Sequence, residues 1–191
     1  MRLHMRSISA ALGCIVLLSS CAKTELGMNP ESITNPVTPV AITPGIVSIP
    51  VKDRVNIGRL SGKTLSGQKY SLTKSSNLMV INVWASWCTN CRLEWKDLQA
   101  AALRNPEVIF LGINASDKRA DAKAFIKKHG DNYQHIFDPD LIAFGSMRGV
   151  SSASIPMTLI LDRSQRVAAQ ILGKVKIADL TNLLKSLGKE N

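Results

Sequence analysis

Two nearly continuous apolar runs occur along this chain, at residues 78–84 and 108–113. Such runs are typical of central strands that are buried on both faces of a sheet. Each run is followed by a segment in which apolar residues recur at helical spacing, over residues 89–103 and 117–129. Gly130 follows the second of these segments and marks its end. The pattern therefore predicts two consecutive strand–helix units.

Shorter patterns lie on both sides of these units. Residues 157–161 and 167–172 predict two further strands around a turn, and residues 177–187 predict a final amphipathic helix. Upstream, residues 55–60 and 63–72 predict a short hairpin. Strands that alternate with helices predict an α/β fold. We expect a central mixed sheet with helices on both faces and an N-terminal β-hairpin.

The first 20 residues have the pattern of an export signal. Arg2 and Arg6 precede an apolar run at residues 8–18, which is too short to span a bilayer. The run ends in Leu-Ser-Ser-Cys at Cys21, which resembles the lipobox of bacterial lipoproteins. The resemblance implies that residues 1–20 are removed and that Cys21 carries acyl chains that anchor the protein to a membrane. The alternative is ordinary signal cleavage, with Cys21 as a free thiol.

Residues 21–50 contain five prolines and show neither helical nor alternating periodicity. This composition is typical of a semi-extended tether. We therefore expect three parts: a lipoprotein signal peptide at residues 1–20, a lipidated cysteine with a proline-rich tether at residues 21–50, and a folded domain at residues 51–191.

The chain has 191 residues, of which 45% are hydrophobic, and its formal net charge is +10. The positive charge would favour an anionic membrane surface or an acidic partner. It does not indicate nucleic-acid binding, because the lysine and arginine residues are scattered and aromatic residues make up only 5% of the chain. The four cysteines are too few and too unevenly spaced for a disulfide scaffold.

Cys88 and Cys91 lie three positions apart at the predicted junction of a strand and a helix. A Cys-x-x-Cys pair at such a junction is typical of thioredoxin-like redox sites. The unpaired N–H groups and the dipole of a helix N-terminus stabilise a thiolate. We expect Cys88 to be the nucleophile and Cys91 to resolve the mixed disulfide. Trp87 would shield one side of the pair.

Three alternatives exist for this pair of cysteines. In the first, the two cysteines are half of a zinc site, but the spacing of the other candidate ligands, His129 and His135, does not suit such a site. Two inert core cysteines are another, although their place beside two tryptophans argues against it. The third is a non-catalytic lipoprotein that carries a soft metal ion such as Cu(I). We predict no metal and no cofactor.

The sequence Val-Trp-Ala-Ser-Trp-Cys-x-x-Cys-Arg-x-Glu at residues 83–94 resembles the TlpA/ResA branch of the thioredoxin superfamily. The likeness covers most of residues 51–189, including Ile-Pro-Met-Thr-Leu-Ile-Leu-Asp at residues 155–162. Members of this branch are extracytoplasmic, membrane-tethered thiol–disulfide oxidoreductases. Relatives of this layout reduce apocytochrome c before haem attachment and draw electrons from a membrane protein of the CcdA/DsbD type. The resemblance implies the same location, protein substrates and electron donor.

Glu94 shares the apolar face of the predicted helix with Cys91. Desolvation there would raise the pKa of its carboxyl, which suits a proton carrier. From spacing alone, an exposed glutamate that supports the helix is the alternative. In the TlpA/ResA branch a glutamate at this position moves protons to and from the second cysteine. Asn82 replaces the buried aspartate of cytoplasmic thioredoxins, so Glu94 would be the only carboxylate beneath the dithiol.

Ile155 and Pro156 match an element of the superfamily in which the proline is cis and faces the disulfide. The resemblance implies that these two residues and Trp87 bind the substrate; the alternative is a trans proline that opens a strand. Two positions depart from the family pattern. Lys96 stands where thioredoxins have a helix-kinking proline, and Met157 stands where the family often has threonine. Both concern the fit of the substrate rather than the redox chemistry.

The leading hypothesis is a monomeric thiol–disulfide reductase, anchored by lipid to the outer face of a bacterial membrane. A disulfide-forming oxidase is one alternative, because Thr89 and Asn90 match neither the Gly-Pro of thioredoxins nor the Pro-His of strong oxidants. A thiol peroxidase is another, although Ala85 occupies the position at which peroxiredoxins carry threonine or serine.

Overall fold

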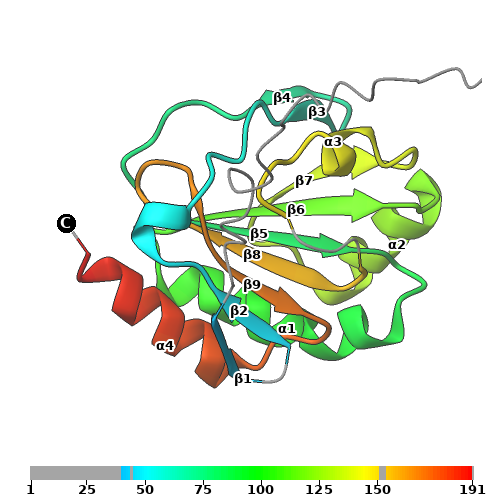
Figure 1. The fold of residues 1–191 in the computed structure, drawn as a ribbon. Helices are drawn as coiled ribbons and strands as arrows, with labels where there is room; N and C mark the ends of the chain where they lie inside the picture. Colours follow the sequence, from blue (N-terminus) through cyan, green and yellow to red (C-terminus); the bar gives the residue numbers. More distant parts are fainter. Residues whose placement is uncertain (1–39, 44, 151–153, 191) are drawn as a thin grey trace, which may run out of the picture. The chain divides into compact units, whose positions relative to one another are not determined.

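The computed structural model of the protein describes residues 40–43, 45–150 and 154–190. Within these residues, nine strands form one sheet in the order β1-β2-β9-β8-β5-β6-β7-β3-β4 (Figure 1). The strands are β1 (Val40–Thr43), β2 (Ile46–Ser48), β3 (Ser61–Thr64), β4 (Lys69–Ser71), β5 (Met79–Trp84), β6 (Ile109–Ala115), β7 (Gln134–Asp138), β8 (Met157–Leu161) and β9 (Val167–Leu172). The helices are the 3-10 helix η1 (Val51–Asp53) and the α-helices α1 (Thr89–Arg104), α2 (Arg119–His129), α3 (Ile142–Gly145) and α4 (Ile177–Gly188).

The centre of the sheet consists of β5, β6 and β7, which are parallel, and β8, which is antiparallel to β5. Every residue of β5 is buried, as its continuous apolar run predicts. The hairpin β3–β4 extends the sheet beyond β7, while β9, β2 and β1 extend it beyond β8. The expected mixed sheet is confirmed. Because β5, β6 and β7 are parallel, the segments that follow them all emerge at one edge of the sheet.

Alternate residues of β5 enter two hydrophobic cores on opposite faces of the sheet. Val80 packs in one core with Leu98 of α1 and Leu184 of α4. Ile81 packs in the other core, which contains Phe144 of α3. Burying each such side chain contributes about 1.5–3 kcal/mol, so the two cores together hold the layers in place. Helices cover both faces as predicted, with α1 and α4 on one face and the short α3 on the other (Figure 1).

The predicted hairpin is displaced along the chain. Its two strands, β3 and β4, both lie between residues 61 and 71, and the prediction of a strand at residues 55–60 is wrong. That segment forms a single isolated bridge, between Asn56 and Arg166. Its buried side chains, Ile57 and Leu60, are three positions apart, whereas one face of a strand needs a spacing of two.

The sheet begins before residue 51, the predicted start of the domain. β2 pairs with β9, and Ile46 of β2 is buried in the same core as Ile171 of β9. Strands this short lack a recognisable period-two pattern, so the sequence predicts β1 and β2 as part of the tether at residues 21–50. The pattern does not predict β7 either, because β7 buries His135 and Asp138 where a strand pattern would place apolar residues.

Among the described residues, no helix is both long enough and apolar enough to cross a bilayer. The predicted signal peptide at residues 1–20 and the predicted lipidation of Cys21 lie outside the described residues. Both stay predictions.

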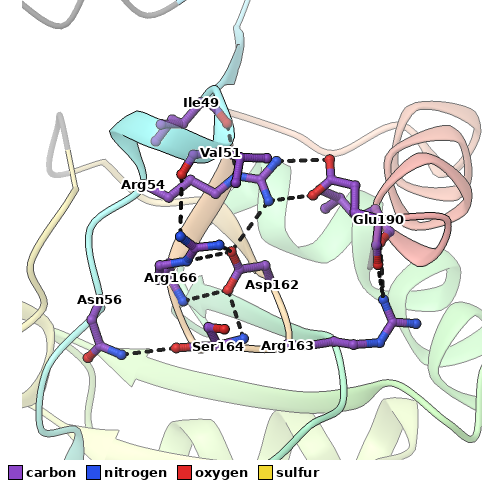
Figure 2. Close-up of polar contacts among 10 residues, drawn as sticks. Ile49, Val51, Arg54, Asn56, Asp162, Arg163, Ser164, Arg166 and Glu190 are labelled. Carbon is purple, nitrogen blue, oxygen red and sulfur yellow. Dashed lines mark hydrogen bonds and ion pairs between the residues drawn. The ribbon is translucent and has the colours of Figure 1, made fainter.

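A polar cluster joins the segment after η1 to the turn between β8 and β9 and to the end of α4 (Figure 2). The Arg54 side chain, which is 5% exposed, donates to the carboxylates of Asp162 and Glu190. These contacts with Arg54 lower the pKa of Glu190. Burial alone would raise the pKa of Asp162, but hydrogen bonds from Arg166 and Ser164 bring it below its ordinary value. The cluster therefore ties the segment after η1 and the end of α4 to the β8–β9 turn.

Replacing Arg54 by methionine should lower the free energy of unfolding by about 2 kcal/mol, because two carboxylates lose a charge-assisted partner. Methionine keeps much of the apolar stem, so the effect reports the guanidinium. Arg59→Met is the matched control, because Arg59 is exposed and its side chain should contribute little. Urea denaturation at neutral pH measures both variants. Equal losses in the two variants would contradict the role of the cluster.

Candidate active site

Cys88 forms the N-cap of α1, directly after the loop that leaves β5. A disulfide joins it to Cys91, and the backbone N–H of Cys91 donates to the Cys88 sulfur at 3.1 Å. Cys88 is 5% exposed and Cys91 is 1% exposed, so a partner reaches Cys88 more easily. On reduction, the N-terminus of α1 would stabilise a thiolate on Cys88. The roles of Cys88 as nucleophile and of Cys91 as resolving thiol are compatible with this placement and stay predictions.

Asp117 holds the loop that carries the dithiol. Its carboxylate accepts hydrogen bonds from the backbone N–H and the hydroxyl of Ser86, at 2.6 and 2.9 Å. It also accepts from Asn114 Nδ2 at 2.9 Å and from the backbone N–H of Lys118 at 2.7 Å. Asp117 lies two residues before α2, at the position where the helical spacing predicts that helix to begin. Its contact with Ser86 depends on the neighbouring ends of β5 and β6, which local spacing does not reveal.

Trp87 lies beside the disulfide with 58% of its surface exposed. Its indole Nε1 donates to the carbonyl oxygen of Ser116 at 2.9 Å. This bond anchors the polar edge of the ring and leaves apolar surface open to solvent. Arg92 donates from Nε to the Ser86 carbonyl oxygen at 2.7 Å and further orders this loop. The contact of Trp87 with a substrate stays a prediction.

Glu94 lies one turn after Cys91 in α1 and is 1% exposed. Its Oε1 accepts a hydrogen bond from Asn82 Nδ2 at 3.0 Å, and its Oε2 accepts from the backbone N–H of Val175 at 2.7 Å. Burial raises the pKa of Glu94 to about 7, while the two hydrogen bonds and nearby Lys174 limit the rise. The alternative of an exposed glutamate is wrong. A carboxyl that titrates near neutral pH can both accept and release a proton.

The free energy of unfolding of the oxidised protein should fall by about 3 kcal/mol between pH 4.5 and pH 7 because of Glu94. In the unfolded chain the carboxyl ionises near its model value of 4.5, whereas in the folded protein it keeps its proton up to about pH 7. Between these two pKa values the folded state therefore binds one proton more than the unfolded state. The stabilisation is complete below pH 4.5 and is lost as the pH rises through about 7.

Urea denaturation of the oxidised wild type and of Glu94→Gln, at about pH 4.5, 6 and 8, isolates this contribution. Glutamine removes the titration and leaves the other carboxylates in place. Relative to the variant, the wild type should lose stability as the pH rises. A difference between the two proteins that does not change with pH would contradict the raised pKa.

The Ile155–Pro156 peptide bond is cis, as the resemblance implies, and the trans alternative is wrong. β8 begins at the next residue, and Met157 pairs with Val83 near the end of β5. Ile155 and Pro156 therefore lie at the sheet edge from which the Cys88 loop leaves. Ile155 also packs against the buried cluster that contains both cysteines. The role of these two residues in binding a substrate stays a prediction.

An aromatic cluster that local spacing does not predict supports the dithiol. Trp84 and Trp95 lie in the same buried cluster as the two cysteines, and their rings are 4.7 Å apart. Trp84 Nε1 donates to His135 Nδ1 at 3.0 Å, and His135 Nε2 lies 3.0 Å from an Asp131 carboxylate oxygen. An indole N–H can only donate, so Nδ1 is the acceptor. Gly112 leaves room for the ring, because a Cβ there would lie 1.8 Å from Nδ1.

Within the described part of the chain, no three or more His, Cys, Asp or Glu side chains are grouped so as to hold a metal ion. His135, one candidate for a zinc site, has its two ring nitrogens engaged with Trp84 and Asp131. His129, the other candidate, packs its ring against Phe125 at a centroid distance of 4.5 Å. The structure therefore does not bring the two histidines together as ligands beside the dithiol.

Curated relatives carry names that refer to thiol chemistry. The thiol:disulfide interchange protein DsbE of Allochromatium vinosum is 37% identical over 97 residues, which are 50% of this chain and 51% of the relative. The thiol:disulfide interchange protein HelX of Rhodobacter capsulatus is 28% identical over 100 residues, which are 52% of this chain and 54% of the relative. The chain thus spans about half the length of these curated relatives.

Solved structures match a larger part of the chain. A DsbF homologue from Corynebacterium diphtheriae is 29% identical with a TM-score of 0.70, and the match covers 74% of this chain and 92% of the other. A secreted thiol-disulfide isomerase from Corynebacterium glutamicum is 30% identical with the same TM-score of 0.70, over 76% and 93% of the two chains. The predicted thioredoxin-like fold is confirmed. Since the sequence model of the AhpC/TSA family also matches residues 56–170, more than half of the chain, the protein belongs to the AhpC/TSA family.

Proposed function

We propose that this protein is an extracytoplasmic thiol–disulfide oxidoreductase that reduces disulfides of other proteins. The observation that carries the proposal is the Cys88–Cys91 disulfide at the N-terminus of α1, with the buried carboxyl of Glu94 one turn further along the helix. The names of the curated relatives, thiol:disulfide interchange proteins, support this chemistry.

The reaction begins with the reduced dithiol. The Cys88 thiolate attacks one sulfur of the substrate disulfide and releases the other sulfur as a thiolate, which takes a proton. Cys91 then loses its proton to the Glu94 carboxylate and attacks the Cys88 sulfur, which releases the second substrate sulfur as a thiolate. This thiolate takes a proton from solvent, to which Glu94 returns the proton of Cys91, so the substrate leaves as a dithiol. The substrate gains two electrons and two protons, and the enzyme ends with the Cys88–Cys91 disulfide present in the structure. A separate electron donor must then reduce this disulfide.

The proposal extends to location and partners. The Leu-Ser-Ser-Cys sequence that ends at Cys21 supports a lipid anchor, and the secreted isomerase among the similar structures supports a place outside the cytoplasm. With the TlpA/ResA resemblance, these observations favour apocytochrome c as a substrate and a CcdA/DsbD-type membrane protein as the electron donor. Incubating the purified, reduced protein with oxidised apocytochrome c and counting the free thiols of the cytochrome tests the substrate.

The reduction potential decides the direction of electron flow. A reductase requires a potential below about −180 mV, whereas strong disulfide-forming oxidants lie near −120 mV. We expect the lower value, measured by equilibrating the Cys88–Cys91 pair with glutathione buffers and quantifying both forms by thiol labelling. A potential near that of the strong oxidants would favour the oxidase alternative instead.

The anchor has its own test. Cells that express the wild type should hold the protein in the membrane fraction and should incorporate labelled fatty acid into it. Cys21→Ser should lose the label and move the protein into the soluble fraction. Retention of the label in Cys21→Ser would contradict lipidation at this residue.

A further inference from the structure

Asn82 of β5 is the side-chain partner of Glu94, and one of its two polar atoms is unused. Asn82 is 2% exposed, and its Nδ2 donates to Glu94 Oε1 at 3.0 Å and to Thr158 Oγ1 at 3.1 Å. Its Oδ1 is buried and accepts no hydrogen bond within the part of the chain that the structure describes. A buried polar atom without a partner is unfavourable, and such atoms are rare in folded proteins. This one therefore calls for an explanation.

The two neighbours of the amide can each act as donor or acceptor. The Thr158 hydroxyl does both, and Glu94 accepts when ionised but donates when protonated. Half a turn of the Asn82 carboxamide about its last bond exchanges Oδ1 and Nδ2. Oδ1 has two lone pairs, so it would then accept hydrogen bonds from the Glu94 carboxyl and from the Thr158 hydroxyl together. Both orientations thus make two hydrogen bonds and leave one amide atom unused.

We propose that Asn82 is a positioning residue whose side-chain amide turns when Glu94 gains or loses its proton. When Glu94 is ionised, Asn82 Nδ2 donates to its carboxylate and to the Thr158 hydroxyl. When Glu94 is protonated, its carboxyl O–H donates to Asn82 Oδ1, and the Thr158 hydroxyl changes from acceptor to donor. Asn82 itself neither gains nor loses a proton. The inference deepens the proposed function and rests on it, because the buried carboxyl must be stable in both protonation states to exchange a proton with Cys91.

The titratable groups around Glu94 come from several elements. Cys91 lies one turn earlier in α1, Lys174 lies between β9 and α4, and Tyr133 lies just before β7. Burial raises the pKa of Tyr133, so its hydroxyl keeps its proton. In the oxidised protein Cys91 is part of the disulfide and does not titrate. The oxidised form is therefore the one in which Glu94 is best observed alone.

NMR spectroscopy of the oxidised wild type, labelled with ¹⁵N and ¹³C, tests the proposal directly. The chemical shifts of the Glu94 carboxyl carbon and of the Asn82 side-chain nitrogen are followed from about pH 5 to about pH 9, an interval that contains the pKa of Glu94. We expect both signals to shift with one shared midpoint. An Asn82 side-chain signal that stays constant while Glu94 titrates would overturn the proposal.

Thr158 variants test the reversal of the hydroxyl. Thr158→Ser keeps the hydroxyl and should preserve the shared midpoint, whereas Thr158→Val keeps the shape and should greatly reduce the Asn82 shift. Identical behaviour of the two variants would overturn the reversal. Asn82→Leu should raise the Glu94 midpoint by about one pH unit, because the ionised form loses a charge-assisted hydrogen bond and the protonated form loses a weaker neutral one. An unchanged midpoint would overturn the contribution of the Asn82 hydrogen bond to the proton affinity of Glu94.

These readouts do not depend on turnover. A wild type that shows the shared midpoint but does not reduce disulfide substrates would overturn the proposed function and not the motion of the amide. A wild type that reduces its substrates while Asn82 stays unresponsive would overturn the motion and not the function.

Discussion

Replacing Cys91 by serine should stop turnover and leave Cys88 joined to its substrate in a stable mixed disulfide. In the proposed reaction Cys88, which is 5% exposed at the start of α1, makes the first attack, and Cys91, which is 1% exposed, supplies the thiol that completes the exchange. Non-reducing electrophoresis of cells that express Cys91→Ser should therefore show adducts of higher mass. Mass spectrometry of the adducts would identify the substrate.

Two controls make the trap specific. Cys88→Ser should lose activity to the background level and should form no adducts, because the remaining Cys91 is buried. Reducing agent should release every adduct formed by Cys91→Ser. Adducts of similar abundance in both variants would contradict the assignment of Cys88 as the nucleophile.

Replacing Glu94 by glutamine should lower the rate of disulfide reduction at neutral pH by about 100-fold, the lower range for loss of a general acid or base. In the proposed mechanism the carboxylate accepts the proton of Cys91, and the Glu94 pKa of about 7 puts this step in the neutral range. The wild-type rate should therefore rise as the pH rises through about 7, since the carboxylate then becomes available. Glutamine accepts hydrogen bonds but no proton, so the rise of the rate near pH 7 should be absent in Glu94→Gln.

Single-turnover kinetics of the reduced protein, followed by tryptophan fluorescence or thiol labelling, measures this step apart from re-reduction. Glu107→Gln is a suitable control, because Glu107 is exposed and lies beyond the end of α1. It should leave both the rate and the profile unchanged. A Glu94→Gln profile that keeps the wild-type limb near neutral pH would show that another group accepts the proton.

The elements that could be predicted are those with a strong local signal. The apolar run of β5 indicates a strand covered on both faces, and the structure buries all of its residues. The helical spacing after Cys88 indicates α1 and puts Glu94 on the apolar face, although spacing alone left an exposed glutamate as the alternative. Here, local pattern and tertiary burial agree, so the candidate site could be located from the sequence.

The features that were missed depend on contacts between distant segments. β2 is recognised only through its pairing with β9, because three residues carry no period of their own. His135 attracted attention only as a possible metal ligand, although its ring is held by Trp84 and Asp131 and fits because Gly112 lacks a side chain. Hydrogen bonds that cross the sheet leave no mark on spacing along the chain.

The pairing of the central strand with a late one also affects how the protein is made. β5 pairs with β8, and β2 pairs with β9, so strands from the last part of the chain complete the sheet around the dithiol. Synthesis delivers the chain from its N-terminus, and contacts between distant segments form slowly. Cys88 and Cys91 therefore leave the ribosome before their structural support exists. Until β8 and β9 have been made, the two thiols therefore lack the strands that complete the sheet beside them.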